Sequence, residues 1–106
     1  MFAMIIYIAG KMAGLPDKGR EHFNRAEERL LAEGHIVLNP ARLPDGMPQE
    51  KYMPICLAML QVADAIYLLD NWKDSPGARL EYNYALYQGK DAWFASTEGA
   101  VSWLTK

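Results

Sequence analysis

The sequence predicts an α/β fold in which parallel strands alternate with helices. Short apolar runs, each about as long as a strand, are separated by longer segments whose apolar residues recur at helical spacing. Glycine or proline stands at most of the junctions. Parallel strands need a connection that crosses the sheet, usually a helix, so this alternation indicates a parallel sheet. At 106 residues, we expect one domain over residues 1–106.

The first half of the chain contains two predicted strands around one helix. Residues 4–10, MIIYIAG, form a continuous apolar run, which is typical of a strand covered on both faces. A helix is expected from about residue 18 to 33, because apolar residues recur there at helical spacing. Gly34 is placed to end that helix. A short strand then follows over residues 35–40, HIVLNP.

The second half repeats the pattern. A helix is predicted over about 50–62, where Pro54 is tolerable only in the first turn. The apolar run 64–70, DAIYLLD, is a buried strand. Ser75 suits an N-cap and Pro76 the first helical position, so a third helix should begin there and end near Gly89.

The chain ends with a predicted fourth strand, DAWFAS at 91–96, and a short closing helix over EGAVSWLTK at 98–106. Together these elements predict a three-layer sandwich with a four- to five-stranded, mostly parallel sheet of the flavodoxin- or Rossmann-like type.

Composition excludes several classes of protein. The net charge of −2 and the scattered Lys and Arg argue against a nucleic-acid surface. No apolar run approaches the roughly 20 residues that span a bilayer, and the N-terminus lacks a signal-peptide pattern, so we expect a cytoplasmic protein. Cys56 cannot form an internal disulfide and lies far in sequence from His22 and His35, so neither a metal nor another cofactor is expected. Cys56 itself is expected to be a small buried residue on a helix rather than a reactive thiol.

A ligand site is expected at one edge of the sheet. In open parallel sheets ligands bind beyond the carboxyl ends of the strands. Those ends are predicted at residues 10–14, at Asn39 with the proline-rich loop 40–50, at residues 70–77 and at Ser96. His35 lies at the opposite end, which favours a structural or solvent role.

Two segments at this edge suit an anion. AGKMAGLPDKGR, residues 9–20, is a glycine-rich turn whose amides can approach a phosphate, although a plain turn fits the pattern equally well. Ser75, Pro76 and Gly77 form a helix start with unpaired amides, which also favours an anion.

Glu81 is the most unusual residue of the third helix. It shares a helix face with Gly77, Ala78 and Ala85, where a charged side chain is costly. Its carboxylate should point back toward the strand ends, close to Tyr7 at the end of the first strand. A phenol beside an ionised carboxylate is suited to nucleophilic attack on a sugar carbon. Tyr7 and the amides of the helix start should keep the pKa of Glu81 low enough for the carboxylate to stay ionised at neutral pH.

Two alternatives stay open for these residues. Tyr7 can be a core aromatic, and Glu81 can form a surface salt bridge to Arg25 or Arg79.

Four segments resemble, in order and spacing, the nucleoside 2-deoxyribosyltransferases and their nucleotide-hydrolysing relatives, and most closely a small uncharacterised branch of that superfamily. The segments are YIAGKMAG, HIVLNPARL, VADAIYLLDNW and SPGARLEYNYAL, and the resemblance runs from Met4 to about Phe94. It implies that Glu81 is the nucleophile for the C1′ carbon and that Tyr7 positions it. It also implies that Ser75 contacts a 5′-phosphate and that the loop from Gly10 to Gly14 surrounds the sugar or phosphate.

The candidate substrate-binding residues are therefore those at the predicted strand ends: Gly10, Lys11, Met12, Gly14, Asn39, Asp70, Trp72, Ser75 and Gly77. The sequence departs from the family at one place. An aspartate that the family carries near the start of the second helix is replaced by Cys56. Asp70 and Asp74 are the nearby acids that can substitute for it.

The leading hypothesis is cleavage or transfer of the N-glycosidic bond of a (deoxy)nucleoside or its 5′-monophosphate, through Glu81. A non-catalytic nucleotide-binding module is the alternative, and a structural homo-oligomer subunit is a third. Five aromatic residues, more than so small a core requires, favour a homodimer or higher oligomer: Tyr82, Tyr84, Tyr87, Trp93 and Trp103. The expected ligand is a small molecule, with no nucleic acid or membrane as partner.

Overall fold

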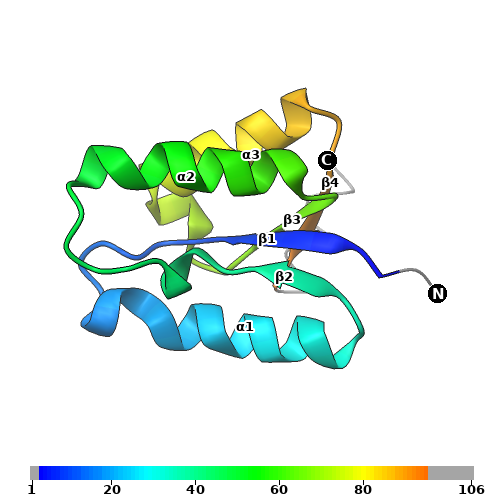
Figure 1. Cartoon of the computed structure of the whole chain (residues 1–106), viewed down its shortest axis with the longest axis horizontal. Helices are drawn as coiled ribbons and strands as arrows, with labels where there is room; N and C mark the ends of the chain where they lie inside the picture. The colour runs from blue at the N-terminus through cyan, green and yellow to red at the C-terminus, as the bar shows by residue number, and fades with distance from the viewer. Residues whose placement is uncertain (1–2, 96–106) are drawn as a thin grey trace.

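The computed structural model of the chain describes residues 3–95 and contains one parallel sheet (Figure 1). Its strands are β1 (Ile5–Ala9), β2 (Ile36–Leu38), β3 (Ala65–Leu68) and β4 (Asp91–Phe94). They pair in the order β2-β1-β3-β4, and all three pairings are parallel. This confirms the predicted α/β class, and the order is that of the flavodoxin-like sheet.

Helices cover both faces of the sheet. Helix α1 (Arg20–Ala32) lies on one face, and α2 (Gln49–Val62) and α3 (Pro76–Tyr87) lie together on the other (Figure 1). Three short 3-10 turns lead into these helices or connect them to the strands: η1 (Pro16–Gly19), η2 (Pro40–Arg42) and η3 (Trp72–Asp74). The described part of the chain is therefore a three-layer sandwich.

Strand β1 sorts its side chains between two cores. Ile6 and Ile8 are fully buried against the α1 side, whereas Tyr7 and Ala9 are buried in the cluster that includes residues of α2 and α3. The alternation follows from the two-residue period of a strand, since a central strand of a covered sheet is apolar on both faces. It also directs the Tyr7 hydroxyl toward α3.

The local signals at helix ends operate as predicted. The Ser75 Oγ accepts a hydrogen bond from the Ala78 amide at 3.1 Å, with Pro76 at the first helical position of α3. Gly34 and Gly89 follow α1 and α3 with φ of +89° and +74°, a conformation that glycine adopts without a Cβ clash.

The placement of Pro54 corrects one expectation. Because α2 begins at Gln49, Pro54 lies beyond the first turn and inside the helix. Proline has no N–H for the carbonyl of Glu50, one turn earlier, but Glu50 is exposed and water can solvate that carbonyl.

His35 has a structural role, as predicted. Its Nδ1 accepts a hydrogen bond from the Met4 amide at 3.1 Å, and its ring packs edge-on against Trp93 with centroids 5.3 Å apart. The predicted closing helix over 98–106, Ser96 and Trp103 lie outside the described residues. Within residues 3–95, no helix is long and apolar enough to cross a membrane.

Candidate active site

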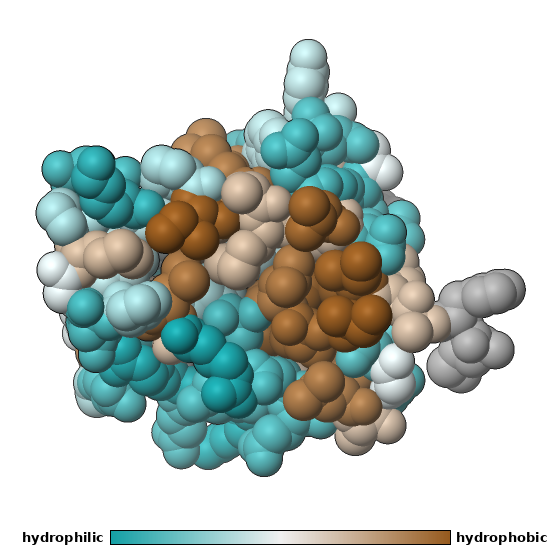
Figure 2. Space-filling view, viewed as in Figure 1, coloured by the Kyte–Doolittle hydropathy of each residue, from teal (hydrophilic) through white to brown (hydrophobic). Residues whose placement is uncertain are grey.

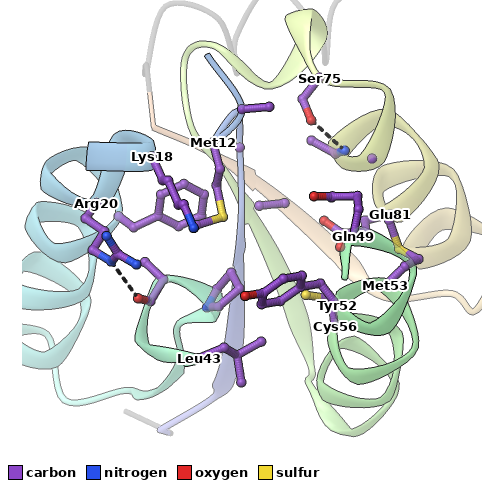
Figure 3. A pocket seen from close by; sticks show the side chains of 18 of the residues that line it. Met12, Lys18, Arg20, Leu43, Gln49, Tyr52, Met53, Cys56, Ser75 and Glu81 are labelled. Carbon is purple, nitrogen blue, oxygen red and sulfur yellow. Dashed lines mark hydrogen bonds between the residues drawn. The ribbon is translucent and has the colours of Figure 1, made fainter. Parts of the chain in front are cut away.

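A cavity of about 750 Å³ opens at the carboxyl end of β1, between α1 on one side and α2 and α3 on the other (Figure 3). This is the edge of the sheet at which the sequence predicts a ligand, beside the β1/β3 switch in strand order. Its wall is mostly apolar and carries a few polar groups, a composition typical of small-molecule sites. The polar and ionisable side chains in the wall are Tyr7, Lys18, Arg20, Asp45, Gln49, Tyr52, Cys56, Ser75 and Glu81.

Tyr7 and Glu81 meet in the wall of this cavity. The Tyr7 hydroxyl donates a hydrogen bond to Glu81 Oε2 at 2.8 Å, and both residues are buried, with 1% and 5% of their surface exposed. Tyr7 occupies the middle of β1 rather than the strand end that the sequence predicts. The contact therefore forms on the covered face of the sheet, because side chain 7 points across to α3.

The surface salt bridge considered for Glu81 does not form. Arg25 pairs with Glu21 at 2.9 Å, and Arg79 donates to the Lys73 carbonyl at 2.6 Å, so neither arginine forms the surface pair considered for Glu81. The small-residue face of α3 is instead buried, with Ala78 and Ala85 at 2% and 0% exposure.

Burial changes the acidity of Glu81. It raises the pKa of the carboxyl to about 7, against the hydrogen bond from Tyr7, which lowers it. The expectation that Tyr7 and the helix amides keep the pKa low is therefore wrong, because the cost of desolvation exceeds the effect of that hydrogen bond. Near neutral pH the carboxyl of Glu81 is therefore present in both its protonated and its ionised form. The pKa of Tyr7 is raised by burial and by the neighbouring Glu81 and Cys56, so the phenol remains a hydrogen-bond donor.

Cys56 lines the same cavity from α2, close to Tyr7. It is 9% exposed, in keeping with the predicted small buried residue. Burial raises the pKa of its thiol, and the hydrogen bond with Tyr7 lowers it. The thiol therefore stays protonated at neutral pH, where it is a poor nucleophile.

The start of α3 forms one end of the cavity. The predicted binding residues Ser75 and Gly77 both line it. The Ser75 oxygen accepts from Ala78, so its hydrogen can be donated to a ligand. A Cβ on Gly77 would lie 3.3 Å from Met53 Cε, which shows how closely α2 packs here.

The glycine-rich turn after β1 contributes unevenly. Gly10, Met12 and Gly14 line the cavity, whereas Lys11 does not. The Lys11 amide is occupied by Asn71 Oδ1 at 2.9 Å. Gly10 is required by packing, because a Cβ there would lie 2.9 Å from Leu69 Cβ, which cannot rotate away.

Three further predicted binding residues do not reach the cavity wall. Asn39 is buried, its Oδ1 accepts from the Ala41 amide at 2.9 Å, and its amide nitrogen donates to Glu27, so it holds the turn η2. Trp72 packs in the core against Tyr82 and Phe94. Asp70 is exposed, as is Asp74, and neither acid lines the cavity.

Several wall residues were not among the predicted ones. Lys18 and Arg20 reach the cavity at the start of α1, Asp45 comes from the loop before α2, and Gln49 and Tyr52 come from α2 itself. The Tyr52 hydroxyl donates to the Pro44 carbonyl at 2.7 Å and so holds that loop. The sequence indicates a glycine-rich turn before α1 and a proline-rich loop before α2. No local pattern indicates which of their side chains point into the cavity.

Comparisons with known proteins agree with this architecture. A family model described as a domain of unknown function, DUF4406, matches residues 4–94. No curated protein matches the chain. Among solved structures, a 2-desoxiribosyltransferase from Leishmania mexicana superposes with a TM-score of 0.70 and 24% sequence identity. The match covers 88% of this chain but only 64% of the other, so this chain spans less than two thirds of that protein's length. At this identity the likeness shows a shared fold.

Proposed function

The chain belongs to the DUF4406 family, and from its deoxyribosyltransferase-like fold and its buried Tyr7–Glu81 pair we propose that it cleaves or transfers the N-glycosidic bond of a (deoxy)nucleoside or its 5′-monophosphate. One observation carries the proposal: a hydrogen bond of 2.8 Å holds the Glu81 carboxylate in the wall of a cavity large enough for such a ligand.

Glu81 is the proposed nucleophile. Tyr7 binds Oε2 and so orients the carboxylate, which leaves Oε1 to attack the C1′ carbon. A bond forms between Oε1 and C1′ while the C1′–N bond breaks, and its electron pair leaves with the base. Water or a second base then displaces Glu81 from the glycosyl-enzyme. Only the ionised carboxylate attacks, so with a pKa of about 7 for Glu81 the activity should rise with pH through the neutral range.

Ser75 and Gly77 support a phosphorylated ligand. The Ser75 hydroxyl and the Gly77 amide stand at the positive end of α3, where the helix dipole favours an anion. We therefore expect 5′-monophosphates to be preferred over the matching nucleosides.

The test is release of free base. The full chain is incubated with a panel of nucleosides and 5′-monophosphates, and the products are separated by chromatography. We expect base release in the wild type, and a fall of several orders of magnitude in Glu81→Gln, which keeps the shape of the side chain and loses the nucleophile. Glu28→Gln, at an exposed glutamate of α1, is the matched control and should leave the rate unchanged. Full activity of Glu81→Gln would remove the proposed mechanism.

A non-catalytic nucleotide-binding module is the second candidate. Among the described residues, Glu81 and Asp45 are the two carboxyl groups in the cavity wall, and the thiol of Cys56 occupies the place where the family resemblance implies an aspartate. Nucleotide binding without base release from any member of the panel would favour this candidate.

We also propose that the chain forms a homodimer or a higher homo-oligomer. Apolar surface gathers on one face of the molecule (Figure 2), and the large apolar side chains that the structure leaves exposed include Ile36 in β2 and Val62 in α2, at 56% and 63% exposure. Burial of this surface against a second copy would stabilise both chains. Light scattering at tens of micromolar should give at least twice the monomer mass, and a monomer at that concentration would contradict the proposal.

A further inference from the structure

Two cationic side chains enter the cavity on the side opposite Glu81. Lys18 belongs to η1, and Arg20 is the first residue of α1. Figure 3 shows both across the cavity from Glu81 and Ser75. The surrounding wall is apolar, with Met12, Phe23 and Leu43 among its residues, so the two cations and the Asp45 that they bind are the charged groups that a ligand meets on this side.

Both cations bind the same oxygen of Asp45. Lys18 Nζ lies 3.1 Å from Asp45 Oδ1, and Arg20 Nη2 donates to that same atom. Asp45 belongs to the loop before α2, and 62% of its side chain is exposed. An anionic oxygen between Lys18 and Arg20 is therefore already accommodated here, and it comes from a side chain that has room to move aside.

Arg20 is held in place independently of Asp45. Its Nη1 donates to Asp17 Oδ1 at 2.6 Å and its Nε to the Ala41 carbonyl at 3.3 Å, and only 22% of its side chain is exposed. If Asp45 moves away, the guanidinium keeps two of its three partners. It is a preorganised donor for an oxyanion.

The backbone that carries the two cations has an uncommon conformation. Asp17, Lys18 and Gly19 all have positive φ, at +48°, +56° and +72°. Lysine rarely adopts this conformation, and such outliers are more frequent at binding sites than elsewhere. A Cβ at Gly19 would lie 2.9 Å from the Lys11 carbonyl oxygen, so glycine is required where this turn packs against the loop after β1.

The proposed chemistry places the leaving base near these cations. A nucleophile attacks C1′ from the side opposite the bond that breaks, so the base lies away from Glu81 and toward Lys18 and Arg20. Asp45 cannot serve as the acid that protonates the base, because Lys18 and Arg20 hold its pKa below the usual range. What this side of the cavity offers is positive charge.

We propose that Lys18 and Arg20 form an oxyanion subsite for the leaving group, and that the ligand is a nucleoside or nucleotide whose base carries a carboxylate. The ligand carboxylate takes the position of Asp45 Oδ1, and Asp45 turns to solvent. The ligand class rests on the proposed function, whereas the subsite rests on the geometry of the two cations.

Two matched ligand pairs test the subsite by titration calorimetry. Orotidine 5′-monophosphate is compared with uridine 5′-monophosphate, and adenylosuccinate with adenosine 5′-monophosphate. The first pair adds one carboxylate near the glycosidic nitrogen, and the second adds the two carboxylates of a succinyl group far from it. The full chain is used in the Glu81→Gln background so that no ligand is consumed. In at least one pair, we expect the acidic member to bind at least about tenfold more tightly than the other member, as charge-assisted hydrogen bonds to two cations imply.

Variants of the subsite should change the affinity for the acidic ligand in opposite directions. Arg20→Gln or Lys18→Gln should bring the affinity ratio of that pair toward one, while the affinity for the member whose base carries no carboxylate should change by no more than about twofold. Asp45→Asn should raise the affinity for the acidic member, because it removes a competing carboxylate. Arg25→Gln, at an exposed arginine of the same helix, is the matched control and should leave the ratio unchanged.

Ratios near one for both pairs would overturn the inference, as would a ratio that survives both Arg20→Gln and Lys18→Gln. Weaker binding of the acidic ligand to Asp45→Asn would also overturn it, since Asp45 would then hold the cations in place rather than imitate a ligand. Because calorimetry does not depend on turnover, a failed base-release assay with a retained ratio contradicts the proposed function alone.

Discussion

The two walls of the cavity shift the pKa values of their carboxyl groups in opposite directions. On the β1 and α3 wall, Glu81 is 5% exposed and has one hydrogen bond, from Tyr7. On the α1 wall, Asp45 is exposed and lies against two cations. Burial raises the pKa of Glu81, whereas its neighbours lower the pKa of Asp45. A carboxyl group near neutral pKa suits a chemical step, and a permanently charged cluster suits binding.

This contrast has one physical cause. Desolvation raises the energy of a buried carboxylate by more than a single neutral hydrogen bond recovers. In water the same group has no such penalty, and nearby cations stabilise its charge. The two walls should therefore respond differently to pH, to loss of a partner and to salt.

After replacement of Glu81 itself, the largest effect is expected from loss of the Tyr7 hydroxyl. In the wild type, base release should rise with pH through about 7 and level off above it, since only ionised Glu81 attacks. Tyr7→Phe removes the hydrogen bond that lowers this pKa. The midpoint should move to higher pH, and the rate at pH 7 should fall about tenfold or more. A pH–rate profile measures both, and a midpoint that does not move would contradict the assigned role of Tyr7.

The next largest effect concerns stability. The folded chain binds the Glu81 proton more tightly than the unfolded chain, with a pKa of about 7 against 4.5. Stability contributed by this group is therefore present below about pH 4.5 and is lost as the pH rises toward 7. The full loss is on the order of 3 kcal/mol, an upper limit. Glu81→Gln does not titrate, so it should become more stable than the wild type above pH 7.

Denaturant unfolding of both proteins from pH 4 to 8 tests this linkage. Their difference in unfolding free energy should be smallest at pH 4 and should grow across the window between 4.5 and 7. A difference that is independent of pH would show that Glu81 keeps an ordinary pKa in the folded chain.

The smallest effect is expected on the opposite wall. Asp45→Asn removes an exposed carboxylate whose ion pairs are screened by water and salt, so thermal unfolding should change little. No step between pH 5 and 8 should appear in its stability relative to the wild type. A large loss of stability in Asp45→Asn would mean that the loop before α2 depends on this cluster.

Local chemistry determined most of the elements of this fold. The cap at Ser75, the glycines after α1 and α3 and the apolar runs of the strands each act through a few neighbouring residues, and their elements lie where the sequence predicts them. Pro54 is the exception, because α2 begins at Gln49 and Pro54 therefore lies beyond the first turn.

Only the tertiary structure decided which side chains share the cavity. Tyr7 and Glu81 are 74 positions apart, and the sequence brings them together only through the resemblance and through the geometry of parallel strands. Asn39 and Trp72 lie at predicted strand ends. In the structure, however, the Asn39 side chain hydrogen-bonds within the turn η2 and Trp72 packs in the core. Lys18, Arg20 and Asp45 converge from two loops whose composition indicates a turn but no direction.

The pKa of Glu81 shows most clearly what the sequence determines and what the tertiary structure determines. Spacing along α3 places the carboxyl on a small-residue face and so predicts an unusual environment. The direction of its pKa shift depends on how much water β1, α2 and α3 jointly exclude from it. Helix spacing and caps act between residues within a turn or two of each other, whereas desolvation sums over every element packed around the group.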